Sequence, residues 1–267
     1  KVKSRHYSGN LIVVSAGEKS TWCTPNHKWL ARWTNKSQLA WVTYLMRQGV
    51  RWRVGQCRLF RSGQKNFGLS ERARVEKADA AWILEVHPSL EAALAHEQIV
   101  AAHYGLPEIV FQPPSNIKYF TQEVIDTVFE SLDSEEMKKR ALLCLSDFRR
   151  DENYPIYQQA NAHERRGRTT LFETQACNLV EDYMSIPIAP DTITGHDKKD
   201  RHAVSWSPVS LSQRPYYGLV YSLDIDRYHK YVADGLVTCN SIYSFRGADS
   251  GALDRLKHEL QAAELPL

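Results

Sequence analysis

The sequence lacks any apolar run approaching the roughly 20 residues of a membrane-spanning helix, and its N-terminus has no apolar signal core. Cysteine is scarce, and the few cysteines form no CxxC pair, which argues against a zinc site and against a disulfide framework. The five cysteines are Cys23, Cys57, Cys144, Cys177 and Cys239. We therefore expect a soluble, unexported protein in the reducing cytoplasm.

No charge of either sign is in large excess. The chain has 34 Lys and Arg residues against 31 Asp and Glu, a formal net charge of +3, so any surface that binds nucleic acid must be a local basic patch. Repeats and low-complexity tracts are also absent. Of the 267 residues 43% are hydrophobic, which is enough to bury the core of one large domain or two smaller ones.

Both ends of the sequence carry β patterns. Residues 7–33 alternate apolar and polar positions on either side of Gly17, which predicts a hairpin of short strands. Further strands are predicted at 169–172, 183–188, 204–207, 218–225 and 231–237, where β-branched and aromatic residues stand between Gly and Pro. These two regions favour a mainly β domain.

The middle of the chain has a different character. It predicts strands at 40–46, 52–59 and 81–86 and helices at 70–77 and 89–104, the last beginning at the N-cap Ser89 and ending at Gly105. Residues 121–150 have apolar side chains at helical spacing, enough for one or two helices, and the charged segment 149–168 is interpreted as a linker. The sequence thus predicts a β domain interrupted by an α/β insertion and a helical spacer.

The segment 220–241 contains residues that together can break a peptide bond. The side-chain amide of Asn240 can attack its own backbone carbonyl, closing a succinimide and releasing the next residue. The amine is a poor leaving group and needs a proton donor, a role that His229 can take. Ser241 supplies a hydroxyl that can accept an acyl group and return it to its own freed amine.

These residues resemble the two C-terminal motifs of inteins, which have the Hint fold. The resemblance extends to Thr24-Pro25-Asn26-His27, similar to the motif whose Thr and His polarise the upstream scissile peptide, and to the segment 169–188. It implies protein splicing, an autocatalytic reaction without a cofactor. Taken alone, Thr24 to His27 is an ordinary turn and His229 an ordinary histidine.

The sequence departs from the usual intein pattern at three places. The N-terminal Cys or Ser segment is missing, which implies either a split intein, whose partner is a separate N-terminal fragment carrying the upstream host segment, or a truncated chain. Cys239 stands where the penultimate His is usual, so a proton must come from His229, water or elsewhere. Ser222 stands where an Asp is often found.

Ser222 points to a particular class of inteins, which lacks the N-terminal nucleophile. That class has a Trp two residues after the motif His, as Trp29 is here, and a Thr two residues before the terminal Asn, as Thr238 is here. A Cys at the place of Ser222 then attacks the upstream bond, so the resemblance implies that Ser222 is a weaker, natural or engineered, nucleophile. The alternative is that Trp29 is a core residue and Thr238 an ordinary strand residue.

The insertion resembles the GIY-YIG homing endonucleases. Tyr44 lies on the first predicted strand, Trp52 stands where a second Tyr is expected, and Val42-Thr43 replaces the Gly-Ile pair. The resemblance implies that Arg72 or Arg74 faces a phosphate and that Glu97 binds a divalent metal, Mg²⁺, for DNA cleavage. Glu97 and the arginines can equally be solvated surface residues.

Residues 241–267 resemble a motif of UvrD-type DNA helicases that offers aromatic side chains to single-stranded DNA, and a helix is predicted at 253–264. The predicted organisation is a first Hint part (1–37), an endonuclease-like insertion (38–112), a helical spacer (113–166), a second Hint part (167–240) and a host segment (241–267). Two other functions remain open. One is a homing endonuclease that binds or cuts DNA on an inert Hint scaffold, and the other is a helicase fragment with a structural insertion.

Overall fold

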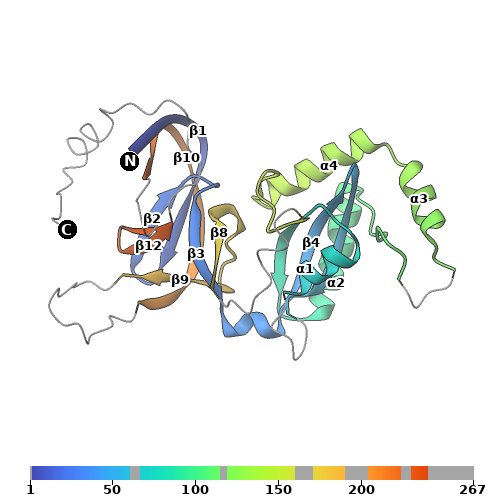
Figure 1. Ribbon diagram of the computed structural model, residues 1–267, viewed down its shortest axis with the longest axis horizontal. Coiled ribbons are helices and arrows are strands. Elements are labelled where there is room, and N and C mark those ends of the chain that lie inside the picture. Colours follow the sequence, from blue (N-terminus) through green and yellow to red (C-terminus); the bar gives the residue numbers. More distant parts are fainter. Residues whose placement is uncertain are drawn as a thin grey trace. The chain divides into compact units, whose positions relative to one another are not determined.

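A computed structural model of the chain describes residues 2–60, 67–114, 119–159, 171–189, 204–223 and 230–239. With 46% strand and 28% helix the fold is mainly β. The chain divides into two compact units (Figure 1). The first, here the β unit, comprises 1–31, 172–176 and 185–267, and the second, the α/β unit, comprises 32–171 and 177–184.

The β unit is built on one eight-stranded sheet. Its strands are β1 (Val2–Ala16), β2 (Lys19–Cys23), β3 (Lys28–Trp33), β8 (Leu171–Gln175), β9 (Met184–Ile188), β10 (Ser205–Leu223), β11 (Lys230–Ala233) and β12 (Leu236–Cys239). They are ordered β11-β12-β3-β9-β10-β1-β2, with β8 paired to β3 and an additional pairing of β12 with β9. The sheet therefore places β12, near the end of the chain, beside β3, near its beginning (Figure 1).

Two-residue turns make the hairpins of this sheet. The predicted hairpin around Gly17 is confirmed, since Ala16 pairs with Lys19. The prediction of one strand over 231–237 is wrong. Asp234 and Gly235 both have positive φ (48° and 81°), the geometry of a type I′ turn, so the chain reverses there and forms β11 and β12.

The strand β10 also differs from expectation. Two strands were predicted, at 204–207 and 218–225, because Pro208, Pro215 and Gly218 normally interrupt a strand. The structure has one strand of 19 residues, which pairs with β1 from Val209 to Leu223. A proline has no N–H to donate, but a strand can contain it at a position where no neighbouring strand needs that hydrogen bond. The prolines therefore do not end β10.

The α/β unit has a four-stranded antiparallel sheet in the order β5-β4-β6-β7, and helices of the same unit pack against its strands (Figure 1). The elements are β4 (Trp41–Gln48), β5 (Arg51–Arg58), α1 (Gly68–Val75), β6 (Ala80–His87), α2 (Leu90–Tyr104) and β7 (Tyr157–Gln158). The predicted caps of α2 are confirmed: Ser89 accepts from the backbone N–H of Ala92, and Gly105 is left-handed. β7 lies in the segment interpreted as a linker, so that interpretation is wrong there.

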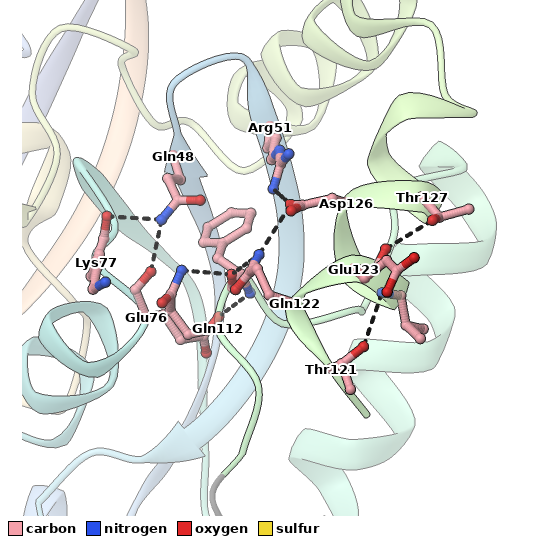
Figure 2. A network of polar contacts seen from close by, with 12 residues as sticks. Gln48, Arg51, Glu76, Lys77, Gln112, Thr121, Gln122, Glu123, Asp126 and Thr127 are labelled. Carbon is pink, nitrogen blue, oxygen red and sulfur yellow. Dashed lines mark hydrogen bonds and ion pairs between the residues drawn. The ribbon is translucent and has the colours of Figure 1, made fainter. Parts of the chain in front are cut away.

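The predicted helical segment forms two helices, α3 (Gln122–Glu130) and α4 (Ser134–Asp147), which belong to the α/β unit. Figure 2 shows how α3 is attached to the β4–β5 hairpin. Arg51 lies 2.6 Å from the carboxylate of Asp126, which also accepts from Gln122 (3.0 Å). The guanidinium of Arg51 also lies 5.1 Å from the ring centre of Phe129.

Two short 3₁₀ helices, Asn35–Leu39 and Ala176–Asn178, lie near the points at which the chain leaves the β unit and enters the α/β unit. The residues 177–184 fold with the α/β unit although they connect β8 to β9. Arg150 holds this segment by donating to the carbonyl oxygens of Cys177 and Leu179. Thr34 also donates to the carbonyl oxygen of Tyr183 (2.8 Å).

Among the residues that the structure describes, no helix is both long and apolar enough to cross a membrane. All five cysteines are described, and none of them is in a disulfide. The host segment 241–267, with its predicted helix at 253–264, lies outside the described residues.

Candidate functional sites

The motif Thr24 to His27 forms a tight turn between β2 and β3. The backbone N–H of His27 donates to the carbonyl oxygen of Thr24 (3.0 Å), with Pro25 in the second position, where its fixed φ suits the turn. The side chain of His27 is buried, with 9% of its surface exposed. The turn therefore places an imidazole inside the β unit rather than on its surface.

His27 is hydrogen-bonded to a residue near the end of the chain. Its Nε2 lies 2.6 Å from Oγ1 of Thr238, whose hydroxyl also lies 3.0 Å from the carbonyl oxygen of Lys28. A hydroxyl has one proton to donate, and a carbonyl can only accept, so Thr238 donates to Lys28 and accepts from His27. The neutral imidazole then carries its proton on Nε2, and Nδ1 is the nitrogen that can accept a proton.

Burial lowers the pKa of His27 from 6.5 to about 4. The imidazole is therefore neutral near pH 7 and retains a lone pair on Nδ1. Aromatic rings flank it edge-on, with ring centres 5.9 Å away for Trp29 and 6.3 Å away for Tyr231. This arrangement keeps water from the ring and fixes its orientation.

Trp29 is fully buried and lies opposite Thr238 in the pairing of β3 with β12. Its indole N–H donates to the sulfur of Cys23 at 3.4 Å. Burial raises the pKa of Cys23 to about 12, although the indole donor opposes this effect, so the thiol is neutral at physiological pH. Trp29 thus acts at least as a core residue that packs against His27 and supports the strand pair.

Cys239, the last described residue of β12, is 2% exposed. Glu173 on β8 lies close enough for its negative charge to act on this thiol. Burial, followed by the negative charge of Glu173, raises the pKa of Cys239 to about 12. The carboxylate of Glu173 also lies 3.5 Å from Nζ of Lys230.

The remaining residues predicted for splicing are not all brought together. Ser222 lies on β10 opposite Lys3, and within the described ranges its side chain makes no hydrogen bond to His27 or Thr238. The side chain of Thr24 is half-buried, and its backbone carbonyl oxygen accepts the hydrogen bond of the turn. Three predicted residues lie outside the described part of the chain: His229, Asn240 and Ser241.

A second polar cluster lies in the α/β unit around Tyr44. This tyrosine on β4 is fully buried and pairs with Gly55 on β5, where a Cβ atom would come within 2.5 Å of the Tyr44 ring carbon Cζ, so only glycine leaves room for the ring. Arg53 donates to the hydroxyl of Tyr44 at 2.9 Å. The pKa of Tyr44 is raised by burial, so the hydroxyl stays neutral.

Arg53, and not Trp52, occupies the position beside Tyr44. Successive side chains of a strand point to opposite faces of the sheet. Arg53, two residues before Gly55, therefore lies on the same face as Tyr44, and Trp52 lies on the opposite face. Trp52 instead stacks on Trp82, with ring centres 5.5 Å apart. Trp52 therefore does not lie beside Tyr44, and Arg53 does.

Glu76, at the C-terminal end of α1, links two arginines of this cluster. It is 1% exposed, and its Oε1 lies 3.0 Å from the guanidinium of Arg53 and 2.6 Å from Nε of Arg72. Its Oε2 accepts from the backbone N–H of Phe111. Arg72 also lies close enough to Tyr44 for their charges to interact, so one buried carboxylate holds two guanidinium groups near the tyrosine.

Glu97 on α2 completes the cluster. It is 9% exposed, and the positive charges of Arg53 and Arg72 act on its carboxylate. Its pKa is nevertheless raised, first by burial and then by the negative charge of Glu108. A single carboxylate is a donor type that Mg²⁺ accepts, since this ion keeps several waters and takes further oxygens from phosphates.

Arg74 does not belong to the cluster. It is exposed and pairs with Glu71 at 3.1 Å. Arg74 is two residues after Arg72, a rotation of about 200° around the helix, so its side chain points away from that of Arg72. Within the described ranges, no three His, Cys, Asp or Glu side chains are grouped as a metal site would require.

Four residues of these sites were not anticipated from the sequence: Cys23, Arg53, Glu76 and Glu173. For Arg53 a signal existed, since it lies two residues before Gly55 on a predicted strand and therefore shares a face with it. The other three are common residue types, and only the tertiary structure brings them to their partners.

The chain matches no protein-family profile, no curated protein and no solved structure. The two sites are therefore interpreted from their own geometry.

Proposed function

We propose that this chain is the larger, C-terminal part of an intein with a Hint fold, which excises itself from a UvrD-type DNA helicase. The hydrogen bond of 2.6 Å between His27 and Thr238 supports this proposal most strongly. It joins the upstream motif to the last strand across 211 positions of sequence. Splicing requires this proximity, because the bonds to be broken lie at opposite ends of an intein.

The downstream step is the cyclisation of Asn240. Two peptide units separate Asn240 from Thr238, so their Cα atoms are at most about 7.6 Å apart. The side-chain nitrogen of Asn240 attacks its own backbone carbonyl carbon and displaces the amine of Ser241. One C–N bond forms, one breaks, and a proton passes from the amide nitrogen to the leaving amine, with His229 as the proposed donor.

The upstream step depends on His27. A neutral imidazole with a fixed tautomer can orient and polarise the upstream peptide bond and exchange a proton through Nδ1. The acyl group then passes to the hydroxyl of Ser241, directly or after attack by Ser222 in the class without an N-terminal nucleophile. The partner supplying the upstream bond is an N-terminal intein fragment joined to the first part of the helicase.

The experiment that tests this function mixes the chain with an N-terminal intein fragment joined to a helicase segment. We expect mass spectrometry to detect the joined host segments and the excised intein ending at Asn240. Replacing Asn240 with Ala removes the attacking amide, so the 240–241 bond should stay intact while a branched ester at Ser241 accumulates.

Replacement of Asn161 with Ala serves as the matched control and should splice like the unmodified chain. An unmodified chain that keeps its 240–241 bond indefinitely when given the N-terminal fragment would overturn the proposal.

A second function is favoured by the cluster in the α/β unit. Tyr44, Arg72 and Glu97 come from three elements, β4, α1 and α2, and share one group of contacts. The GIY-YIG resemblance implies such a group. We propose that this unit binds DNA phosphate and Mg²⁺ as a homing endonuclease, with the ion supplying charge to the scissile phosphate. Arg53 in place of a second tyrosine adds a positive charge beside that phosphate.

Replacing Glu97 with Gln tests this function. Glutamine has nearly the shape of glutamate, so the packing around α2 is kept while the negative charge is lost. We expect Mg²⁺-dependent nicking of a plasmid that carries the uninterrupted helicase sequence to fall at least about 100-fold. Replacing Glu130, an exposed residue on α3, with Gln should leave nicking unchanged. Equal nicking by the Glu97 variant, or none by the unmodified chain, would contradict the catalytic assignment.

A further inference from the structure

The strands β1 and β10 form a two-stranded ribbon in the β unit. They pair along the whole of β1, from Val2 opposite Leu223 to Ala16 opposite Val209 (Figure 1). The neighbour of β1 on its other side, β2, joins it only at 12–16, and β9 joins β10 only at 205–208. Among the described strands, the stretches 2–11 and 214–223 are therefore paired with each other alone.

The fixed charges of these two strands have one sign and lie on one face. Neither strand contains Asp or Glu, and the cations are Lys3, Arg5 and Arg214. Odd-numbered residues of β1 pair with even-numbered residues of β10, so the three cations share a face. The opposite face has His6 but no lysine, arginine or carboxylate. A face with cations and no acid is complementary to a polyanion.

Aromatic side chains lie between these cations on the same face. Tyr7 and Tyr216 are on it by the same alternation, and Trp22 on β2 joins them through the pairing of β2 with β1. The guanidinium of Arg214 lies 3.7 Å from the ring centre of Trp22, which lies 5.6 Å from that of Tyr216. The guanidinium of Arg5 lies 5.8 Å from the ring centre of Tyr7. Rings and cations are therefore in direct contact across the ribbon.

Two glycines let the tyrosine rings lie along the strands. A Cβ atom at Gly9 would be 2.9 Å from the hydroxyl oxygen of Tyr7, and one at Gly218 would be 2.9 Å from that of Tyr216. Each tyrosine hydroxyl donates to a backbone carbonyl three residues further along its own strand, at 3.0 and 2.7 Å. Both rings are thus held over the backbone, and a nucleic-acid base can stack on the outer face of a ring held in this way.

We propose that this face binds single-stranded nucleic acid. We call it the ribbon face, and it consists of Lys3, Arg5, Tyr7, Trp22, Arg214 and Tyr216. Bases stack on the aromatic rings, and the three cations neutralise phosphates. An extended peptide would instead be recognised through backbone hydrogen bonds at a strand edge and side-chain pockets, so rings and cations on a sheet face favour a nucleic acid. The inference is independent of the splicing and nuclease proposals, because it uses no residue of either site.

The test is the fluorescence anisotropy of a labelled single-stranded oligothymidine of about 20 nucleotides, measured in EDTA. We expect Tyr216→Leu to weaken binding roughly 5- to 150-fold, the effect of losing one stacking ring. Tyr217→Leu is the matched control. Tyr217 is 81% exposed and is the next residue of the same strand, so it lies on the opposite face and its loss should leave the affinity unchanged.

Arg5→Gln tests the phosphate contacts at an exposed position. Each contact with a phosphate of a single strand contributes about −0.7 to the slope of log K against log salt concentration, so the slope should become less steep by about 0.7. Lys138→Gln, at an exposed lysine of the α/β unit, is the control and should leave the slope unchanged.

Several results would overturn the inference. They include no binding by the unmodified chain, and equal losses in Tyr216→Leu and Tyr217→Leu, which would indicate a general change of the ribbon. Equal affinity for a duplex of the same length, with no loss in Tyr216→Leu, would mean that phosphate alone is recognised. Variants of the ribbon face that slow association with the N-terminal intein fragment, in a chain that binds no oligonucleotide, would assign the face to a protein partner. If Tyr216→Leu does not fold, the salt dependence of Arg5→Gln decides alone.

Discussion

In the proposed splicing reaction, replacing His27 with Ala is expected to slow breakage of the upstream peptide bond by about 10²- to 10⁴-fold, the usual contribution of a positioned acid or base. The physical reason is that His27 is held neutral by burial and in one tautomer by Thr238. Alanine removes both the proton-exchanging nitrogen and the donor to Thr238. The measurement is the rate of branched ester formation in the Asn240→Ala background, with the N-terminal fragment supplied in excess.

Thr238→Val provides a graded comparison. Valine keeps the shape but cannot fix the tautomer of His27, so the same rate should fall roughly tenfold, about 1.4 kcal/mol. Thr21→Val, at another buried threonine of the β unit, is the control and should leave the rate unchanged. A His27→Ala rate equal to that of the unmodified chain would remove His27 from the mechanism.

The same imidazole makes the stability of the β unit depend on pH. The pKa of His27 falls from 6.5 to about 4 on folding, so between these values the unfolded chain binds more protons than the folded chain. The contribution of the neutral His27 to the free energy of unfolding is about 3 kcal/mol. It is fully present above pH 6.5 and is lost as the pH falls toward 4. In His27→Ala this part of the pH dependence should disappear from urea unfolding curves.

Replacing Glu76 with Gln is expected to destabilise the α/β unit by about 3–5 kcal/mol, because it leaves the guanidinium groups of Arg53 and Arg72 without their buried counter-charge. Arg53 is 2% exposed and cannot turn to water. The measurement is unfolding in guanidinium chloride, followed by near-ultraviolet circular dichroism, to which the stacked Trp52 and Trp82 of this unit contribute.

Glu71→Gln is the matched control for Glu76→Gln. Glu71 lies on the same helix and pairs with an arginine, but the partner, Arg74, is 64% exposed, so we expect a change within about 1 kcal/mol. Equal losses in the two variants would mean that the Glu76 network contributes no more than a surface pair. Nicking activity, if the unit is a nuclease, should fall in Glu76→Gln even at temperatures where the unit remains folded, because Arg72 loses its orientation.

Much of the secondary structure could be predicted from local signals. The caps Ser89 and Gly105 fixed the ends of α2, and Gly17 fixed the first hairpin, because capping and turn geometry depend on a few neighbouring residues. The errors arose where a local signal competed with pairing. Pro208 and Pro215 did not end β10, and two residues at 157–158 became a strand because β6 offered an edge.

By itself the sequence determined which chemistries are available: an Asn followed by Ser at 240–241, a His in a tight turn at 27, and a Tyr, an Arg and a Glu on three elements of the insertion. Residue types and short spacings carry that information, since it depends on the covalent chain. Only the tertiary structure decided which residues become partners. Thr238 reaches His27, Glu173 reaches Cys239, and Arg53 rather than Trp52 reaches Tyr44, because strand order and the two-residue alternation of a sheet are set by long-range pairing.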